Sequence, residues 1–256
     1  MDSGLILETV NLRKAFGALV AVADVSIKVR ANTLHSIIGP NGAGKTTFFN
    51  LLSGNLEPTS GRVIFKGKDI THQPVHRSIH MGMGRSFQIT NIFPNLTVYE
   101  NNRLACQALG KDNFRFLRHV SRFKKYDERT WEVIQRVGLK ERAFSPARTL
   151  PHGDQRKLEL GMILAPDPEL LLLDEPTAGM AAEQVPELIR LIQEIQRKGS
   201  KTVMLVEHNM NVVMNVSDTI TVMHQGQVLA EGTPAEISAH KDVQTAYLGG
   251  LYELSS

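Results

Sequence analysis

Apolar and polar positions alternate through residues 5–16 and 19–29, and Gly17 lies between the two segments. Alternation with a period of two is typical of strands that bury one face, so these segments predict two paired antiparallel strands. A third segment of this kind, residues 61–66, is followed by a turn at Gly67. Together the three segments predict an antiparallel sheet near the start of the chain.

Three shorter segments, residues 34–38, 169–173 and 202–206, are almost continuously apolar. Strands that are buried on both faces have this composition, and they occur mainly in parallel sheets. Residues 219–224 and 227–231, on either side of a Gln-Gly turn, predict a hairpin. The chain therefore predicts a parallel sheet beside the antiparallel one.

Helical periodicity dominates a stretch at about 71–150 that is rich in Asn, Arg, His and aromatic residues. We expect this stretch to be a helical subdomain inserted into the core. Gly199 is expected to end a helix over 183–197, and capping residues predict a helix over 233–239. The other predicted helices cover residues 47–52, 98–109, 112–123, 127–137 and 155–165.

This order of strands and helices predicts an α/β fold in one domain, residues 1–256, with a C-terminal tail over 240–256. Hydrophobic residues make up 42% and charged residues 21% of the chain, as in a globular protein with a sizeable core. The net charge of +3 is too small to indicate nucleic acid, and no such partner is expected. With one cysteine, Cys106, no disulfide and no cysteine-based metal site is predicted within the chain. We expect a cytoplasmic protein, because no secretory signal and no membrane-length apolar run is present.

The most informative motif separates Gly39 by four residues from Gly44, Lys45 and Thr46. This is the phosphate-binding loop pattern, and the strand predicted before it and the helix after it are the context that the pattern requires. Lys45 is expected to reach the β- and γ-phosphates and the Thr46 hydroxyl to ligate Mg²⁺. The alternative is a glycine-rich turn without a ligand. The expected ATP-binding residues of this motif are Gly39, Pro40, Asn41, Gly42, Ala43, Gly44, Lys45, Thr46 and Thr47.

A second motif begins with four leucines and ends in Asp174, Glu175 and Pro176. Ligands of α/β sheets lie beyond the carboxyl ends of the strands, so both carboxylates should face the phosphates. Asp174 is expected to hold Mg²⁺ and Glu175 to act as general base on the attacking water. A strand followed by an exposed acidic turn is the alternative interpretation.

Residues 150–156 read Leu-Pro-His-Gly-Asp-Gln-Arg. Together with the two motifs above, this segment resembles the signature of the ATP-binding-cassette (ABC) ATPases, which is similar to Leu-Ser-Gly-Gly-Gln and opens a helix. The signature contacts an ATP that is held by a partner subunit. The residues that the resemblance assigns to it are Leu150, Pro151, His152, Gly153 and Asp154.

Other landmarks of this family follow in the same order. Gln88 lies in a segment that resembles the Q-loop, so its amide is implied to sense Mg²⁺ and the attacking water. His208 resembles the switch histidine that contacts the γ-phosphate, and Phe16 the aromatic residue that stacks on adenine. The resemblance places the D-loop at Ala178, Gly179, Met180 and Ala181.

The resemblance covers nearly the whole chain and implies a P-loop NTPase (RecA-like) fold, the ABC nucleotide-binding domain. Members of the family bind ATP with Mg²⁺ between two ATPase subunits packed head to tail, in a homodimer or a heterodimer. Closure and reopening of that dimer drive two membrane permease subunits. We therefore expect this chain at the cytoplasmic face of the inner (plasma) membrane, held peripherally through the permeases.

Residues 153–159 and 207–210 and the ending Ala246-Tyr247-Leu248-Gly249-Gly250 are similar to the ATPases of branched-chain and hydrophobic amino acid importers. In those systems a separate substrate-binding protein selects the cargo. Alternatives within the family are a urea or short-amide importer and an exporter. A DNA-repair cassette ATPase, a two-cassette translation factor and a small-molecule kinase are disfavoured, because the chain has one cassette, no heptads and both the signature and His208.

Two departures from the family pattern carry a hypothesis of their own. Pro151 replaces the signature serine, and Ala181 replaces the usual D-loop aspartate. We expect sites that use these segments to hydrolyse ATP more slowly. Ile92 and Phe93 are the candidate permease contacts, and the alternative is that both belong to the core of the helical subdomain.

Overall fold

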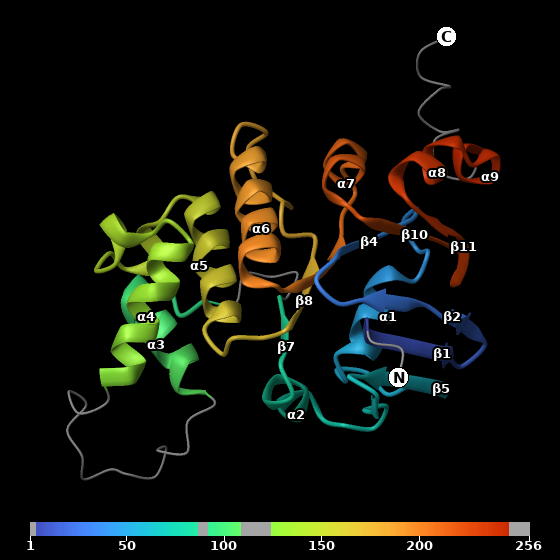
Figure 1. Cartoon of the computed structure of the whole chain (residues 1–256), viewed down its shortest axis with the longest axis horizontal. Helices are drawn as coiled ribbons and strands as arrows, with labels where there is room; N and C mark the ends of the chain where they lie inside the picture. Colours follow the sequence, from blue (N-terminus) through green and yellow to red (C-terminus); the bar gives the residue numbers. More distant parts are fainter. Residues whose placement is uncertain (1–3, 87–91, 109–123, 246–256) are drawn as a thin grey trace.

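The computed structural model describes residues 4–86, 92–108 and 124–245. Two sheets and a group of helices lie side by side along the long axis of the molecule (Figure 1). The helices α3 (Val98–Gln107), α4 (Lys124–Arg136) and α5 (His152–Leu164) lie at one end and the antiparallel sheet lies at the other. The parallel sheet runs from the middle of the molecule to the end that holds the antiparallel sheet. This arrangement confirms the expected α/β fold with a parallel core, an antiparallel subdomain and a helical subdomain.

The central sheet has six strands, of which five are parallel and the edge strand β11 is antiparallel to β10. The strands β4, β8 and β9 are buried along their whole length, as continuous apolar composition predicts. In spatial order the strands are β11 (Gln227–Gly232), β10 (Thr219–His224), β4 (Leu34–Ile38), β9 (Thr202–Val206), β8 (Leu170–Asp174) and β7 (Met83–Arg85).

The second sheet is antiparallel, with the order β2-β1-β5-β6 and with β3 paired to β1. The segment expected as one strand over 19–29 is divided into β2 and β3. Asp24, at the end of β2, has a left-handed φ of 57°, which interrupts an extended strand. The strands are β1 (Leu5–Phe16), β2 (Leu19–Val25), β3 (Lys28–Arg30), β5 (Ser60–Phe65) and β6 (Lys68–Asp69).

The predicted helices that fall within the described residues are all present, with differences at their ends, whereas the helices at Val75–His80, Met210–Val216 and Lys241–Val243 were not individually predicted. Helix α5 begins at His152 rather than at residue 155, because the extended backbone of Pro151 serves as its N-cap. Helix α6 includes Gly199 and ends at Ser200, which takes the left-handed conformation. The helices are α1 (Lys45–Leu52), α2 (Val75–His80), α3 (Val98–Gln107), α4 (Lys124–Arg136), α5 (His152–Leu164), α6 (Val185–Gly199), α7 (Met210–Val216), α8 (Pro234–Ala239) and α9 (Lys241–Val243), with 3₁₀ turns at Lys140–Arg142 and Ala147–Thr149.

The segment expected as helical, about 71–150, is not helical throughout. It contains strand β7, which pairs with β8 and so belongs to the central sheet. Helices α3 and α4 follow that strand and pack on α5. The helix expected over 112–123, and residues 246–256 of the tail, lie outside the described residues.

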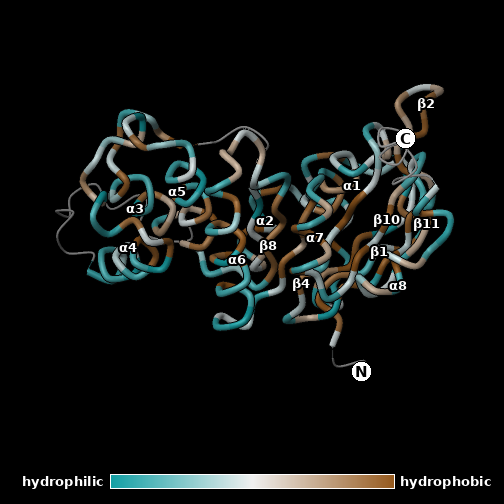
Figure 2. The backbone as a smooth tube through the Cα atoms, turned by 90° about the horizontal axis from the view of Figure 1, so that it is seen from above, coloured by the Kyte–Doolittle hydropathy of each residue, from teal (hydrophilic) through white to brown (hydrophobic). Residues whose placement is uncertain are grey.

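Two large clusters of buried side chains form the core. One joins the antiparallel sheet to α1 and to one face of the central sheet, and it includes Phe48, Phe49 and Phe65. The other joins the opposite face of the central sheet to α5 and α6. Figure 2 shows the hydrophobic residues along the strands and the hydrophilic ones on the outer turns of α4 and α6. The central strands are therefore fixed from both faces, and their carboxyl ends are held in a fixed arrangement.

Candidate active site

Three adjacent strands of the central sheet, β4, β9 and β8, deliver the predicted catalytic residues to one edge. The phosphate loop follows β4, and Glu207 and His208 follow β9. Asp174 is the last residue of β8, and Glu175 follows it. Because these strands are parallel, all three loops leave the sheet at the same edge. The sheet order thus brings together residues that are far apart in the sequence, at the place where α/β folds bind ligands.

The phosphate loop has a backbone that two of its glycines make possible. Gly39 has a φ of 153°, and a Cβ atom there would lie 2.2 Å from the carbonyl oxygen of Met223. Gly44 has a φ of 97°, and a Cβ atom would lie 2.3 Å from the carbonyl oxygen of Ala21 in β2. A side chain at either position would displace the loop. The loop is therefore held between β10 and the antiparallel sheet.

The first turn of α1 faces this loop without a side chain that caps it. Gly44 is the N-cap residue, and the first turn contains no acidic residue. The backbone N–H groups of this turn and the positive end of the helix dipole attract an anion. Lys45 in the same turn is buried and donates to the carbonyl oxygens of Gly39, at 2.7 Å, and Pro40, at 3.0 Å. Burial lowers the pKa of Lys45, while the charges of Glu175 and Asp174 oppose that shift.

The opposite end of α1 is fixed by Arg85, the last residue of β7. Its guanidinium donates to the carbonyl oxygen of Phe49 at 3.1 Å, to the side-chain oxygen of Asn50 at 2.7 Å and to the Ser53 hydroxyl. A cation at the C-terminal end of a helix is stabilised by the dipole. The strand that leads toward Gln88 is therefore tied to the phosphate-loop helix. Gln88 itself lies outside the described residues.

Asp174 carries a carboxylate that the described residues leave without a hydrogen bond. Its side chain is 1% exposed, and neither oxygen has a hydrogen-bond partner there. Burial raises its pKa, and the nearby charge of Arg85 opposes the shift. A buried carboxylate without donors is costly unless a cation accompanies it. This donor set suits Mg²⁺, which prefers carboxylate and hydroxyl oxygens.

Glu175 and His208 meet at the same edge of the sheet. The Oε1 atom of Glu175 lies 2.7 Å from the Nε2 atom of His208. Glu175 has a φ of 49°, a left-handed conformation that is uncommon for a residue of this kind. Its N–H donates to the carbonyl oxygen of Val206 at 2.9 Å. The backbone thus holds the two side chains together, as expected for a base and its partner.

The segments predicted as the signature, residues 150–154, and as the D-loop, residues 178–181, lie against each other in this chain. The ring of His152 approaches Gly179, and the side chain of Gln184 approaches Gly153. Leu150 is buried, and Asp154 pairs with Arg142 at 3.1 Å and Lys157 at 3.4 Å. Among the D-loop residues, Ala178, Gly179 and Ala181 are exposed and Met180 is half-buried.

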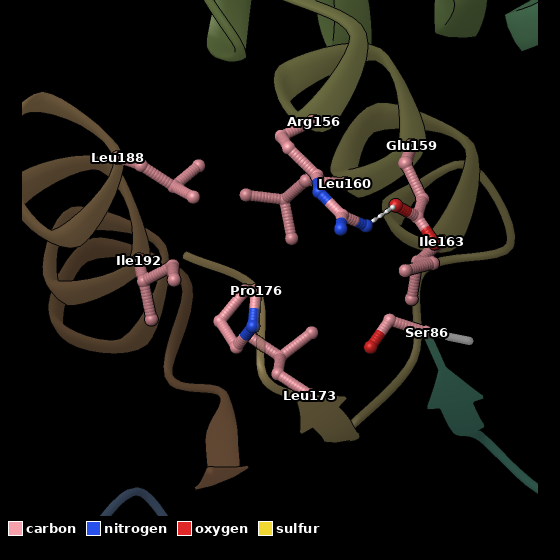
Figure 3. Close-up of a pocket in the computed structure, with 9 residues that line it drawn as sticks. All are labelled: Ser86, Arg156, Glu159, Leu160, Ile163, Leu173, Pro176, Leu188 and Ile192. Atoms are coloured by element: carbon pink, nitrogen blue, oxygen red, sulfur yellow. Dashed lines mark hydrogen bonds and ion pairs between the residues drawn. The ribbon is translucent and has the colours of Figure 1, made fainter. Parts of the chain in front are cut away.

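Arg156 joins the helix after the signature to the D-loop. It pairs with Glu159 at 3.0 Å and donates to the carbonyl oxygen of Ala178 at 3.3 Å. In Figure 3 both side chains point from α5 into a small cavity between α5 and α6, near Ser86 and Pro176. No sequence motif predicted this buried pair.

The signature does not lie beside the phosphate loop of its own chain. Helices α5 and α1 are well separated along the long axis in both views (Figures 1 and 2). The predicted adenine contact, Phe16, lies at the end of β1 and is 48% exposed, with the Lys14 ammonium 5.2 Å from the centre of its ring. The ring is therefore accessible, and Phe16 pairs with Leu19 of β2, the strand whose Ala21 carbonyl lies beside Gly44.

The two candidate permease contacts differ. Ile92 packs against the buried cluster around α5 and α6, which fits the core interpretation for that residue. Phe93 is 51% exposed and lines a groove with Ala105, Ala108 and Met162. Arg85 and Glu159 supply charges to the same groove.

Glu207 and Thr177 also lie at this site, and no sequence motif assigned a role to either residue. The buried carboxylate of Glu207 accepts hydrogen bonds from both Thr177 and His208. The available signal was position: Glu207 follows a buried strand directly, as Asp174 and Glu175 do at β8.

Comparison with known proteins agrees with this geometry. The ABC transporter family model matches residues 22–178, and the model of the branched-chain amino acid ATP-binding cassette transporter matches residues 227–252. The chain is 40% identical to the high-affinity branched-chain amino acid transport ATP-binding protein LivG of Salmonella typhimurium, over 95% of this chain and 98% of that protein. It is 39% identical to BraF of Pseudomonas aeruginosa, with the same coverage.

A solved structure resembles the fold closely. It is the ADP conformation of an ATP-binding cassette of an ABC transporter, which superposes with a TM-score of 0.84 at 30% identity and covers 96% of this chain and 99% of its own. The phosphate loop, the carboxylates of β8 and the histidine after β9 thus lie in a fold that binds nucleotide. The chain belongs to the ATPases of the ABC transporter family.

Proposed function

We propose that this protein is the ATP-hydrolysing subunit of an importer for branched-chain or other hydrophobic amino acids. The observation that carries the catalytic part is the meeting of Lys45, Asp174, Glu175 and His208 at the ends of three adjacent strands. The cargo assignment is supported by the names of relatives that are 39–40% identical over 95% of the chain.

Nucleotide binding follows from the loop after β4 and the helix α1. The loop and the first turn of α1 surround the polyphosphate with N–H groups, and Lys45 exchanges its bonds to Gly39 and Pro40 for phosphate oxygens. Phe16 stacks on the adenine. The other residues of the segment 39–47 supply the remaining contacts to ATP.

Mg²⁺ fits this site because Asp174 offers two buried oxygens that lack donors in the described part of the chain. Thr46 and Gln88 are the other proposed ligands. The ion would neutralise charge on the β- and γ-phosphates. Among the described residues, no group of three or more His, Cys, Asp or Glu side chains is arranged so that it could hold a metal ion by itself.

Hydrolysis requires a base on the water that attacks the γ-phosphorus. Glu175 takes the proton of this water as the new P–O bond forms, and the bond to the β–γ bridging oxygen breaks to release ADP and phosphate. His208 holds the Glu175 carboxylate and contacts the γ-phosphate. The hydrogen bond of 2.7 Å between the two side chains supports these roles.

The site is completed by a second ATPase subunit. Because α5 lies far from α1 along the chain's long axis (Figures 1 and 2), the signature residues 150–154 contact an ATP held by the partner. The D-loop residues 178–181 lie beside that signature and face the same interface. A homodimer and a heterodimer with a sister ATPase are both compatible with this arrangement.

Two permease subunits and a separate substrate-binding protein complete the transporter. No helix in the described part of the chain is long and apolar enough to cross a membrane. The chain is held at the cytoplasmic face of the inner membrane through the permeases. Phe93 and the groove beside it receive a permease helix, because the groove combines apolar side chains with the charges of Arg85 and Glu159.

An uptake measurement tests this function. A strain that lacks the gene is complemented with the wild-type chain or with Lys45→Ala, and uptake of labelled leucine and labelled urea is measured at equal protein levels. We expect leucine uptake with the wild type and none with Lys45→Ala. Restored urea uptake without leucine uptake would contradict the cargo assignment, and uptake with Lys45→Ala would contradict the role of ATP.

A further inference from the structure

Glu207 is a buried carboxylate that the roles proposed above do not use. It lies between strand β9 and His208, and its side chain is 3% exposed. One oxygen accepts hydrogen bonds from the backbone N–H and the hydroxyl of Thr177, at 3.1 and 2.5 Å. The other oxygen accepts from the backbone N–H of His208 at 3.2 Å. A single side chain therefore ties the loop after β8 to the loop after β9.

This link restrains the backbone near both members of the Glu175–His208 pair. Thr177 follows Glu175 by two residues, and the carbonyl oxygen of Glu175 accepts from the N–H of Ala178 at 3.0 Å. Fixing Thr177 therefore restrains the turn in which Glu175 has its left-handed φ of 49°. The same carboxylate holds the backbone of His208. Both partners of the 2.7 Å hydrogen bond are thus positioned from one group.

The chemistry of Glu207 indicates a specific role. A buried carboxylate is costly, and donors to each of its oxygens offset the cost. A neutral side chain could fill the same space, but it would not accept hydrogen bonds at both oxygen positions. An amide would present N–H groups to the donor of either Thr177 or His208, and one link would be lost.

We propose that Glu207 is a positioning residue that sets the hydrogen bond between Glu175 and His208 and thereby the rate of ATP hydrolysis. This inference rests on the roles proposed for Glu175 and His208. Because Thr177 directly precedes the D-loop, the carboxylate also connects that loop to His208. Loss of the link is expected to affect turnover rather than nucleotide binding, since both oxygens of Glu207 already accept hydrogen bonds from Thr177 and His208.

Four variants of the full chain test the proposal. Glu207→Gln removes one acceptor, Thr177→Val removes the hydroxyl donor, and Thr177→Ser keeps it. Glu194→Gln, an exposed glutamate on α6 that pairs with Lys198, is the matched control. We expect kcat to fall about 10-fold for Glu207→Gln, with the ATP Kd within twofold of the wild type. The kcat of Thr177→Val should fall by a smaller factor, and that of Thr177→Ser should stay at or above half of the wild-type value. Glu194→Gln should have the kcat of the wild type.

A spectroscopic measurement separates positioning from simple destabilisation. The ¹⁵N resonances of the His208 ring report its hydrogen bond to Glu175, and Glu175→Gln defines their values when the acceptor is changed. We expect Glu207→Gln to move these resonances toward the Glu175→Gln values at a temperature at which both variants are folded. Unchanged ring resonances and unchanged kcat in Glu207→Gln would overturn the proposal.

The proposed roles of the pair can fail separately. If Glu175→Gln hydrolyses ATP at the wild-type rate, the function assigned to Glu175 is wrong whatever Glu207 does. If Glu175→Gln is inactive while Glu207→Gln matches the wild type in both kcat and ring resonances, only the positioning role is wrong. Equal losses of kcat and of ATP affinity in Glu207→Gln would also contradict positioning, because they would indicate general damage to the site.

Discussion

The Nε2 atom of His208 lies 2.7 Å from the Oε1 atom of Glu175, although 33 residues separate them in the chain. The two residues follow adjacent parallel strands, and a left-handed backbone at Glu175 directs its side chain toward the ring. Strained backbone of this kind is found at functional sites, where surrounding contacts maintain it. The network from Thr177 to Glu207 to His208 provides such contacts.

Replacing Asp174 should stabilise the nucleotide-free protein and weaken the Mg²⁺-dependent binding of ATP. Its pKa is raised by burial, so ionisation above that pKa destabilises the fold. Asp174→Asn removes the buried charge, and we expect the nucleotide-free protein to melt about 2–4 °C higher. The same change should abolish the increase in ATP affinity that Mg²⁺ gives.

Calorimetry of the nucleotide-free protein and ATP titrations with and without Mg²⁺ check this prediction, with Asp242→Asn on the exposed tail helix as control. A lower melting temperature would contradict the cost assigned to the buried charge, and Mg²⁺-dependent affinity equal to that of the wild type would show that Asp174 does not hold the ion.

His35 should make the fold sensitive to mild acid. It is buried in β4, its Nε2 atom lies 2.7 Å from the Thr221 hydroxyl, and burial lowers its pKa to about 4. The carboxylate of Glu231 lies 3.9 Å away, but its attraction for a protonated His35 ring does not outweigh the cost of burying that charge away from water. Between pH 6.5 and 4 the unfolded chain takes up a proton at this residue and the folded protein does not. Stability therefore falls as the pH drops through this window, by about 3 kcal/mol in total.

Urea unfolding at pH 7, 6 and 5 measures this contribution. His35→Gln should reduce the loss of stability between pH 7 and pH 5, whereas the exposed-histidine control His76→Gln should leave it unchanged. Equal pH dependence in wild type and His35→Gln would mean that other groups cause the acid sensitivity.

Pro151 and Ala181 should limit the rate of hydrolysis. The signature serine hydroxyl is absent at Pro151, which is the N-cap of α5, and the D-loop has no carboxylate at Ala181. Restoring a phosphate donor and a polar link between subunits with Pro151→Ser and Ala181→Asp should raise kcat, by about 10-fold if each contributes one ordinary hydrogen bond. Steady-state ATPase assays of both single variants and the double variant measure the effect, and an unchanged or lower kcat would contradict it.

Phe93 should matter for transport and not for basal hydrolysis. Its ring is half exposed and lines the groove beside α3 and α5, and it is not among the residues proposed to contact ATP. Phe93→Ala should abolish uptake while the ATPase activity of the isolated chain and its melting temperature stay unchanged. Phe144→Ala, another exposed aromatic that packs with Trp131, is the control and should transport normally. Intact uptake with Phe93→Ala would contradict the proposal that this groove contacts the permease.

The local sequence was sufficient to predict most of the strands and helices of the fold. The apolar runs at 34–38 and 202–206 became strands with the same bounds, because burial on both faces demands continuous apolar side chains. The capping box at Thr233 fixed the start of α8. The two-residue and three-residue strands β6 and β7 have too few residues to show a period, so only tertiary pairing reveals them.

The site was predictable where a motif combines residue types with a local geometry. Lys45, Asp174 and Glu175 belong to such motifs, and the structure brings them together. Glu207 could not be recognised as a buried hydrogen-bond acceptor, because a carboxylate after a strand has the same local pattern whether it is exposed or enclosed. Two of its donors belong to Thr177, 30 residues away, and pairings of that kind depend on the order of the strands.

The most direct test of the account concerns Glu175, the proposed general base. ATP binding and single-turnover hydrolysis should be measured for the wild type and Glu175→Gln, both as the isolated chain with Mg²⁺ and in the assembled transporter. We predict an ATP Kd within a few-fold of the wild type and a hydrolysis rate lower by a factor of about 10²–10⁴, with ATP-dependent dimers accumulating in the variant. A Glu175→Gln variant that binds ATP and hydrolyses it at the wild-type rate would contradict the central claim.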